Sequence, residues 1–406
     1  MERRPIRVFT TPTGDASALS AFSASRATLT LFLTRPAPTL LPKRPDSAMT
    51  QPPAARRVRI VHYCTWADQL EDAAAYLERL AHFDVRTRVT DPNDARIVRM
   101  ARLDCDWHAE NARVFASLTH PQIEFLPARV VGRTGLAALL QIPFPADEEI
   151  WLVVMGQQFE GFGQVAAQLL ALLKKRGLRV LFYAFDEASR AMPCFNAIAP
   201  HLDVLIHDES PLADAGRAAL PPTCVDIHRS WVANILPFAT PFCETPEEKI
   251  VFLGSQLGLT PHRQRQIDFL KKRFGDRFTA IHDHSLPVNA RGQLAARFKV
   301  SVCPEGRKFG TPAMSASHTD RPFWSGCLGL MPVSEDSQQG GRLEALHQAG
   351  LIVRYAHADL DALAVACERA LAATNDERRR IYEHFNRHET VGIVTAEAIA
   401  AAPRRP

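Results

Sequence analysis

The sequence lacks the short motifs that identify several large enzyme classes. It contains no G-x-G-x-x-G, no Walker loop, no H-E-x-x-H and no G-x-S-x-G, which argues against a dehydrogenase, a phosphotransferase, a metalloprotease and a serine hydrolase. Its arginine-rich segments also lack the interleaved aromatic residues of a single-stranded nucleic-acid site. We therefore expect chemistry that none of these motifs describes, and no nucleic-acid partner.

Long apolar runs and paired cysteines are missing as well. No run is long enough to cross a bilayer, so we expect no transmembrane segment. The eight cysteines include no C-x-x-C pair and show no zinc-site spacing, and a chain of this size does not need disulfides to fold. We expect reduced thiols, a cytoplasmic location, no metal ion and no other cofactor.

The composition that is present is that of a globular protein with two domains. The chain has 406 residues, of which 46% are hydrophobic and 23% are charged, enough to build two full cores. The formal net charge of +4 is small for this length and argues only weakly for anionic partners. Composition alone therefore assigns no function.

Residues 1–55 differ from the rest of the chain. They are rich in Ser, Thr, Ala, Pro and Arg and poor in acids, and their only apolar run is Leu29–Leu33. Such a segment is typical of disorder. An acid-poor, Arg- and Ser-rich start also fits a transit peptide, and Met49 offers a third interpretation, in which the natural protein begins there.

Residues 56–235 are predicted to form a first α/β domain. Apolar runs that stop at turn residues indicate strands, and apolar residues at helical spacing indicate helices between them. The strands are expected at 58–64, 150–155, 179–185 and 202–206, and the helices at 69–80 and 164–173. This alternation predicts a parallel sheet covered by helices. A Pro-interrupted stretch, residues 211–246, is a candidate crossing between domains.

Residues 245–375 are predicted to form a second domain of the same kind. Strands are expected at 249–255, 298–302, 330–333 and 351–355, and helices at 263–274, 320–327 and 359–371. Residues 376–406 would form a final helix, 376–388, and a tail. The fold class expected from the two blocks is α/β, with two Rossmann-like domains facing each other across a cleft.

The stretch Thr319–Val333 carries a recognisable motif. It reads TDRPFWSGCLGLMPV and resembles the donor-binding motif of GT-B glycosyltransferases, especially the fucosyltransferase-like and exostosin-like form T-E-K-L-W-x-A-L-x-A-G-x-x-P-V. Asp320 falls on the acid, Arg321 on the base and Gly329 on the glycine. Three features depart from the pattern: Asp in place of Glu, Pro322 at the helix start, and Trp-Ser-Gly at 324–326.

A second resemblance lies at the start of the second block. The strand V-F-L-G-S, which ends at Gly254 and Ser255, is followed by an Arg-bearing helix. This arrangement is similar to the opening of the C-terminal domain in GT-B transferases of the spore-maturation type. Together the two resemblances cover roughly the C-terminal 150 residues.

The resemblance implies transfer of a sugar from a nucleotide-diphosphate donor to a hydroxyl group. Arg321, Arg307 and Lys308 would then neutralise the departing diphosphate without a metal ion. Asp320 would position the donor, and residues 254–255 would let its phosphates approach the backbone closely. Each residue also has a simpler interpretation: a solvated basic loop for 307–308, a helix N-cap for Asp320, and turn chemistry for Gly254.

A general base for the acceptor is expected at a strand end of the first domain, where ligands of open α/β sheets bind. His62 and Asp186 rank first, and residues 207–209 occupy an equivalent position. For each of these residues an N-cap or surface role is the alternative. The acceptor is expected to be a glycan, a lipid or a small molecule, which leaves room for association with a membrane surface.

Two further functions remain as alternatives at this point. A GT-B-shaped binding or scaffold protein without catalysis would account for Pro322 and Trp324 at the motif. A sugar-nucleotide epimerase on the same fold would convert the donor without an acceptor. The sequence does not choose the nucleotide, the sugar or the stereochemical course.

Overall fold

The structure of the protein is a computed structural model. It describes residues 55–64, 111, 113–155, 164–184, 195–207, 219–229, 232–254, 260–281, 288–305, 320–336 and 341–404. All of these belong to one compact unit, Ala54–Pro406. The expected disorder of residues 1–55 and the expected helix at 69–80 lie outside the described residues.

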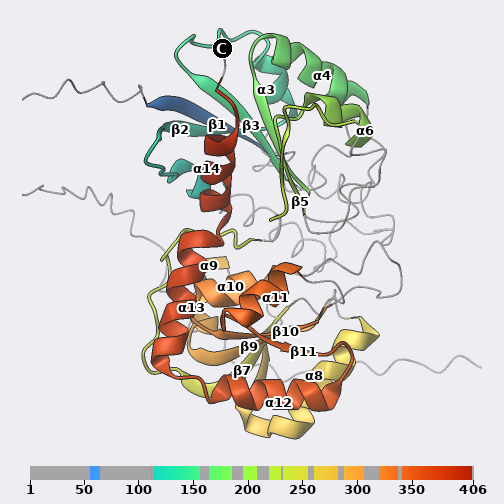
Figure 1. Ribbon diagram of the computed structural model, residues 1–406, viewed down its shortest axis with the longest axis vertical. Coiled ribbons are helices and arrows are strands. Elements are labelled where there is room, and N and C mark those ends of the chain that lie inside the picture. The colour runs from blue at the N-terminus through green and yellow to red at the C-terminus, as the bar shows by residue number, and fades with distance from the viewer. Residues whose placement is uncertain are drawn as a thin grey trace, which may run out of the picture. The chain divides into compact units, whose positions relative to one another are not determined.

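The first sheet has six strands, all parallel, in the order β2-β1-β3-β4-β5-β6 (Figure 1). Its strands are β1 (Arg56–Tyr63), β2 (Ile123–Val131), β3 (Glu149–Met155), β4 (Arg179–Ala184), β5 (Val204–His207) and β6 (Val225–Ile227). The helices described in this part are α3 (Arg133–Ala138), α4 (Gln164–Lys175), α6 (Phe195–Ile198) and the 3-10 turn η3 (Ala199–His201). The four strands expected from apolar runs are confirmed.

Strand β2 was not expected, because its sequence does not read as a buried strand. It occupies the edge of the sheet beside β1, and most of its residues are partly or fully exposed. Pro127 lies within it, which an edge strand tolerates because one side of its backbone has no ladder partner. The pairing with β1 shifts register between Arg59 and Val61.

The second sheet has five parallel strands in the order β11-β10-β9-β7-β8. These are β7 (Glu247–Leu253), β8 (Phe278–Ile281), β9 (Phe298–Cys303), β10 (Met331–Glu335) and β11 (Val353–Tyr355). The helices are α8 (Pro261–Phe274), η4 (Gly275–Arg277), α9 (Val288–Ala295), α10 (Arg321–Cys327), α11 (Gly341–Gln348) and α12 (Leu360–Leu371). Both sheets consist of parallel strands and both are accompanied by helices, which confirms the α/β fold class expected from the sequence.

The short helix α10 is fixed by contacts on three sides. Trp324 Nε1 donates a hydrogen bond to Asn234 Oδ1 at 3.1 Å, and Ser325 Oγ donates to Ser301 Oγ of β9 at 2.8 Å. A Cβ on Gly326 would lie 2.4 Å from the Phe385 ring, so only glycine allows this approach. The Trp-Ser-Gly departure from the glycosyltransferase motif at 324–326 therefore consists of residues that anchor this helix.

Two helices complete the chain, α13 (Asn375–His388) and α14 (Val391–Ala401). Helix α13 contacts α10, and its Ile381 and Phe385 belong to the core of the second sheet. Helix α14 instead places Val394 and Ile399 in the core of the first sheet. The sequence predicted a tail after residue 388; the structure instead forms α14 there, a helix whose residues are mostly buried and show no clear helical period.

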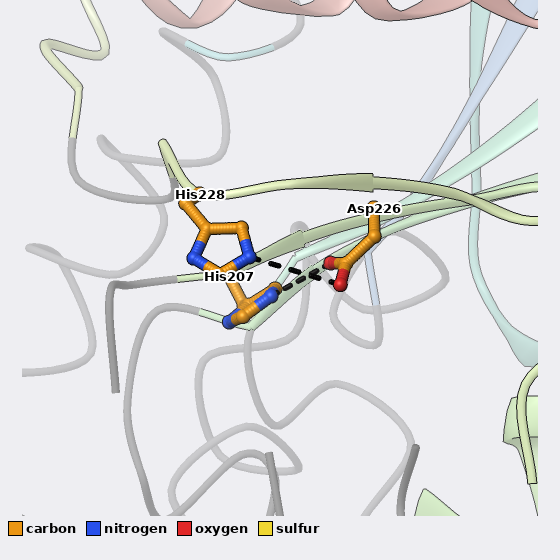
Figure 2. A group of neighbouring side chains, drawn as sticks. All are labelled: His207, Asp226 and His228. Carbon is orange, nitrogen blue, oxygen red and sulfur yellow. Dashed lines mark ion pairs between the residues drawn. The ribbon is translucent and has the colours of Figure 1, made fainter. Parts of the chain in front are cut away.

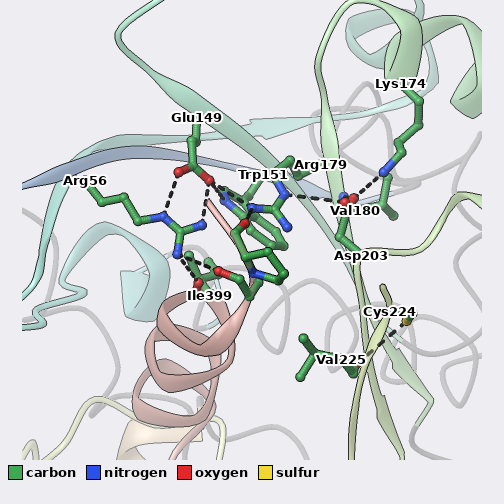
Figure 3. A network of polar contacts seen from close by, with 12 residues as sticks. Arg56, Glu149, Trp151, Lys174, Arg179, Val180, Asp203, Cys224, Val225 and Ile399 are labelled. Atoms are coloured by element: carbon green, nitrogen blue, oxygen red, sulfur yellow. Dashed lines mark hydrogen bonds and ion pairs between the residues drawn. The ribbon is translucent and has the colours of Figure 1, made fainter. Parts of the chain in front are cut away.

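Buried charges hold the end of α14 to the first sheet (Figure 3). Arg56 makes a two-point contact with Glu149, both at 2.6 Å, and its Nη1 donates to the carbonyls of Ile399 and Ala402 at 2.7 and 3.0 Å. Arg179 Nη1 donates to the same carboxylate at 3.2 Å and to a third carbonyl of the C-terminal segment. Two guanidinium groups therefore satisfy carbonyls that the helix end leaves without intrahelical partners.

The described cysteines are free thiols. None of the described helices combines the length and apolarity needed to cross a bilayer.

Candidate functional site

Charged and polar residues gather at one edge of the second sheet. Because all of its strands are parallel, their carboxyl ends meet at that edge, where ligands of open α/β sheets bind. Gly254 follows β7, Glu305 lies just after β9, Glu335 ends β10 and Tyr355 ends β11. Helices α8 and α10 add two arginines and an aspartate to the same edge.

Arg321 is the first residue of α10 and turns toward the end of β7. Its Nε donates a hydrogen bond to the carbonyl of Leu253 at 3.2 Å, and its guanidinium carbon lies 5.8 Å from the centre of the Phe252 ring. Its Nη1 is shielded from solvent and makes no hydrogen bond to the residues that the structure describes. A shielded cationic donor without such a bond is suited to bind an anion.

Arg263 brings a second positive charge to the same place. It lies in the first turn of α8, where its backbone N–H donates to the capping Thr260 at 3.2 Å, and only 6% of it is exposed. Burial, followed by the charge of Arg321, lowers the pKa of Arg263 to about 10, although Glu305 and Glu335 act in the opposite direction. Burial of the guanidinium is therefore the main cost of placing Arg263 at this edge, and the charge of Arg321 adds to it.

Asp320 occupies the N-cap position of α10 without capping the helix through its side chain. Burial raises its carboxyl pKa, while the charges of Arg321 and Arg263 act to lower it. The alternative of a simple side-chain N-cap is therefore wrong. Its carboxylate shares the electrostatic environment of both arginines.

Glu335 organises the opposite part of this edge. The carboxylate is fully buried and accepts hydrogen bonds from the backbone N–H groups of Glu305 and Ala358 at 2.8 and 2.9 Å, and from Gln266 Nε2 at 3.0 Å. His262 Nε2 and His357 Nδ1 each lie 2.8 Å from its Oε1. One carboxylate thus connects β10 to the loops after β9 and β11 and to α8.

The remaining donor residues expected from the sequence are only partly described. Gly254 lies at the end of β7, where its N–H donates to the carbonyl of Ile281 at 3.2 Å. Ser255, Arg307, Lys308 and the base candidate Asp186 lie outside the described residues. Their roles stay predictions.

His62, the other base candidate, belongs to the first sheet. It is the penultimate residue of β1, has no exposed surface, and its ring centre lies 5.1 Å from that of Phe115. Burial lowers its pKa to about 4, against the smaller raising effect of a backbone contact at Val153. The imidazole is therefore neutral at pH 7, and its catalytic role stays a prediction.

The lowered pKa of His62 has a consequence for stability. A histidine in the unfolded chain titrates near 6.5, so between pH 6.5 and 4 the unfolded state binds a proton that the folded state does not. Stability should therefore fall as the pH is lowered through this window, by up to ~3 kcal/mol from this residue alone. Urea unfolding of the wild type and His62→Gln at pH 7.5 and 4.5 measures it: the wild type should lose more stability. Equal losses in both proteins would contradict the prediction.

Sequence reasoning missed Arg263 and Glu335 as site residues. A signal for Arg263 was present, because it follows a strand, a glycine turn and a helix cap. Two further patterns were also passed over. Residues 161–166 read G-F-G-Q-V-A, the variant of the dinucleotide fingerprint that ends in Ala, and most of it lies outside the described residues. Asp-x-Asp triplets occur at 104–106 and 359–361; the second begins with the residue that caps α12.

Comparison with known proteins finds only distant likenesses. No protein-family model matches the chain, and no curated protein matches it. Among solved structures, an O-GlcNAc transferase mutant from Thermobaculum terrenum is 11% identical over 85% of this chain and 67% of its own, with a TM-score of 0.41. A sucrose-phosphate synthase from Thermosynechococcus elongatus is 13% identical over 85% of this chain and all of its own, with a TM-score of 0.39.

A third structure, the glycosyltransferase SnogD from Streptomyces nogalater, is 14% identical over 86% of this chain and 100% of its own, with a TM-score of 0.35. At these TM-scores and identities the likeness assigns no activity and no site residue to this chain.

Proposed function

We propose that the protein transfers a sugar from a nucleoside-diphosphate donor to a hydroxyl acceptor. The observation that carries this proposal is the convergence of Arg321 and Arg263 at the carboxyl edge of the second sheet. Both groups are held by the fold, and the Arg321 Nη1 is shielded from solvent without a hydrogen bond to a described residue. Their placement suits the nucleoside diphosphate, which is the leaving group when the bond between the sugar and the diphosphate of the donor breaks.

Charge supports a diphosphate as the ligand. Two guanidinium groups in a desolvated site repel each other, and the charge of Arg321 adds to burial in lowering the pKa of Arg263. A diphosphate brings several negative oxygens and accepts hydrogen bonds from both groups. Its binding would remove the repulsion, and the same contacts would strengthen as negative charge develops on the leaving group.

The other residues take supporting roles in the proposal. Asp320 would position the donor beside the two arginines, and Gly254 with Ser255 would let the phosphates approach the end of β7. Arg307 and Lys308 would add positive charge from the loop after β9. Because arginines and a lysine supply this charge, we propose that the donor site works without a metal ion.

The acceptor is proposed to be a hydroxyl group of a glycan, a lipid or a small molecule. Its proton would pass to His62 or Asp186 as the sugar–oxygen bond forms. A neutral imidazole can accept that proton, although a pKa of about 4 makes His62 a weak base at pH 7.

Thermal unfolding with nucleotides tests the donor site. We expect one of GDP, UDP, ADP, dTDP or CMP to raise the melting temperature of the wild type, because a ligand that binds only the folded state stabilises it. Arg321→Ala should weaken that binding about 100-fold, through loss of a charge-assisted contact worth roughly 1.5–3 kcal/mol. Arg265→Ala is the matched control, since Arg265 lies on α8 two residues beyond Arg263 but is exposed.

Equal nucleotide affinity in Arg321→Ala and the wild type would remove the proposed donor site. Product analysis with the matching nucleotide sugar then separates the remaining functions. Transfer to an acceptor supports the proposal. Conversion of the donor without an acceptor would indicate an epimerase, and nucleotide binding without turnover would indicate a binding protein.

A further inference from the structure

Two histidines and an aspartate form a second polar cluster, on the first sheet. His207 is the last residue of β5, Asp226 is the central residue of β6, and His228 follows β6 directly. Figure 2 shows the two imidazole rings turned toward the one carboxylate. None of the three has a role in the function proposed above.

Strand register explains why the three side chains meet. Leu205 pairs with Asp226 in the parallel ladder of β5 and β6. Side chains two residues apart in a strand share a face, so His207 lies on the face of Leu205 and His228 on the face of Asp226. Neighbouring strands thus bring both histidines to one side of the sheet, and their ring centres are 4.2 Å apart.

The distances in this cluster are close to those of a metal site. His207 Nε2 lies 2.7 Å from Asp226 Oδ1, and His228 Nε2 lies 3.7 Å from Asp226 Oδ2. One ligand atom from each of the three residues falls within 4.8 Å of the others. Bonds of ~2.1 Å to one ion place ligand atoms about 3.0 to 3.4 Å apart, so a pair at the 4.8 Å limit would have to approach by ~1.4 to 1.8 Å.

We infer that His207, Asp226 and His228 bind a divalent transition-metal ion of the Zn²⁺ class. Two imidazole nitrogens and one carboxylate oxygen are the ligands that such ions prefer over Mg²⁺ or Ca²⁺. Three protein ligands leave a coordination position for water or for an oxygen of a bound molecule. The site lies at the carboxyl ends of β5 and β6, the edge at which open α/β sheets bind ligands.

Burial and access favour an ion at this cluster. The His207 side chain has no exposed surface, and neither ring nitrogen makes a hydrogen bond to a described residue, although Nε2 lies 2.7 Å from Asp226 Oδ1. A coordinate bond from Nε2 would offset part of the free energy that this burial costs. Asp226 and His228 are 30% and 48% exposed. An ion can therefore reach the site from solvent and find one ligand already fixed within the sheet.

A second group of similar composition is less suited to an ion. His262, Glu335 and His357 also bring ligand atoms within 4.8 Å of one another. Both oxygens of the Glu335 carboxylate, however, already accept hydrogen bonds from backbone N–H groups, at 2.8 Å on one oxygen and 2.9 Å on the other. A metal would have to compete with these bonds.

Zinc binding by the full chain tests the inference. The protein is stripped with EDTA, dialysed, and titrated with ZnCl₂ by calorimetry. We expect one high-affinity ion per chain, with affinity reduced about tenfold or more in His228→Ala and in Asp226→Asn. Both changed residues are exposed enough for the variants to fold. Melting temperatures with and without ZnCl₂ give a second measurement, because bound zinc should stabilise the wild type and not these two variants.

Two control variants make the result specific. His201→Ala removes a partly exposed histidine just before the opposite end of β5, and His357→Ala removes a ligand of the second group. Both are expected to bind zinc as the wild type does. Absence of high-affinity zinc binding would overturn the assignment and show that the cluster is purely hydrogen-bonded. Unchanged zinc affinity in His228→Ala, or loss of zinc binding in His357→Ala, would also overturn it.

Discussion

Replacing Glu335 with alanine is expected to lower the free energy of unfolding by about 3–5 kcal/mol. The carboxylate is fully buried and accepts hydrogen bonds from the N–H groups of Glu305 and Ala358 and from Gln266. Its removal leaves these donors buried without an acceptor, which costs more than the bonds themselves contribute. It also removes the charge that opposes the mutual repulsion of Arg263 and Arg321.

Urea unfolding followed by circular dichroism measures this loss. Asp336→Ala is the matched control. Asp336 follows Glu335 in the chain and pairs with Arg354, but 36% of its side chain is exposed. Such exposed pairs contribute less than about 1 kcal/mol to stability. The stability of Glu335→Gln should lie between those of the two alanine variants. Its amide keeps one acceptor oxygen but turns its own N–H₂ group toward the remaining donors. Similar stability in Glu335→Ala and Asp336→Ala would show that this network does not hold the sheet edge together.

Local patterns were sufficient to predict most of the buried strands. Strands β3 and β7 contain continuous apolar runs, 150–155 and 250–253, that are mostly buried. Strand β9 alternates apolar residues with Lys299 and Ser301, and all six of its residues are buried. Strand β2 gave no such signal, since an edge strand alternates exposed and buried residues and tolerates a proline. Helix α14 was missed for the opposite reason: burial on nearly all sides leaves no polar stripe to mark its period.

In the candidate site, too, residues that are close in sequence could be predicted, whereas residues brought together only by the fold could not. Arg321 and Asp320 could be predicted as site residues because they lie within one contiguous stretch that resembles a known motif. Arg263 and Glu335 reach the site from a different helix and a different strand, so their meeting depends on strand order and register, which the sequence does not state. The departures at 324–326 were misleading for a related reason, because the partners that explain them lie on distant segments.

Replacing Arg56 with alanine is expected to destabilise the protein by about 3–5 kcal/mol, with the effect concentrated at the C-terminal helix. The side chain is almost fully buried and donates to Glu149 and to the carbonyls of Ile399 and Ala402. Its loss leaves Glu149 with Arg179 as its main described partner and leaves two carbonyls at the end of α14 without a donor. The helix end should then open at a lower free energy than the strands beneath it.

Hydrogen exchange separates this local opening from global unfolding. In Arg56→Ala the amides of α14 should exchange at least tenfold faster than in the wild type. The amides of β3 and β4 should change their exchange rates only as much as the free energy of global unfolding requires. Arg57→Ala is the control, because that neighbouring arginine is 36% exposed and pairs with Glu124 and Asp147 at the surface, where such pairs contribute less than about 1 kcal/mol. Uniform acceleration across both sheets would mean that α14 unfolds only with the whole chain. An effect no larger than that of Arg57→Ala would mean that apolar packing of α14, rather than the buried arginine, holds the helix on the first sheet.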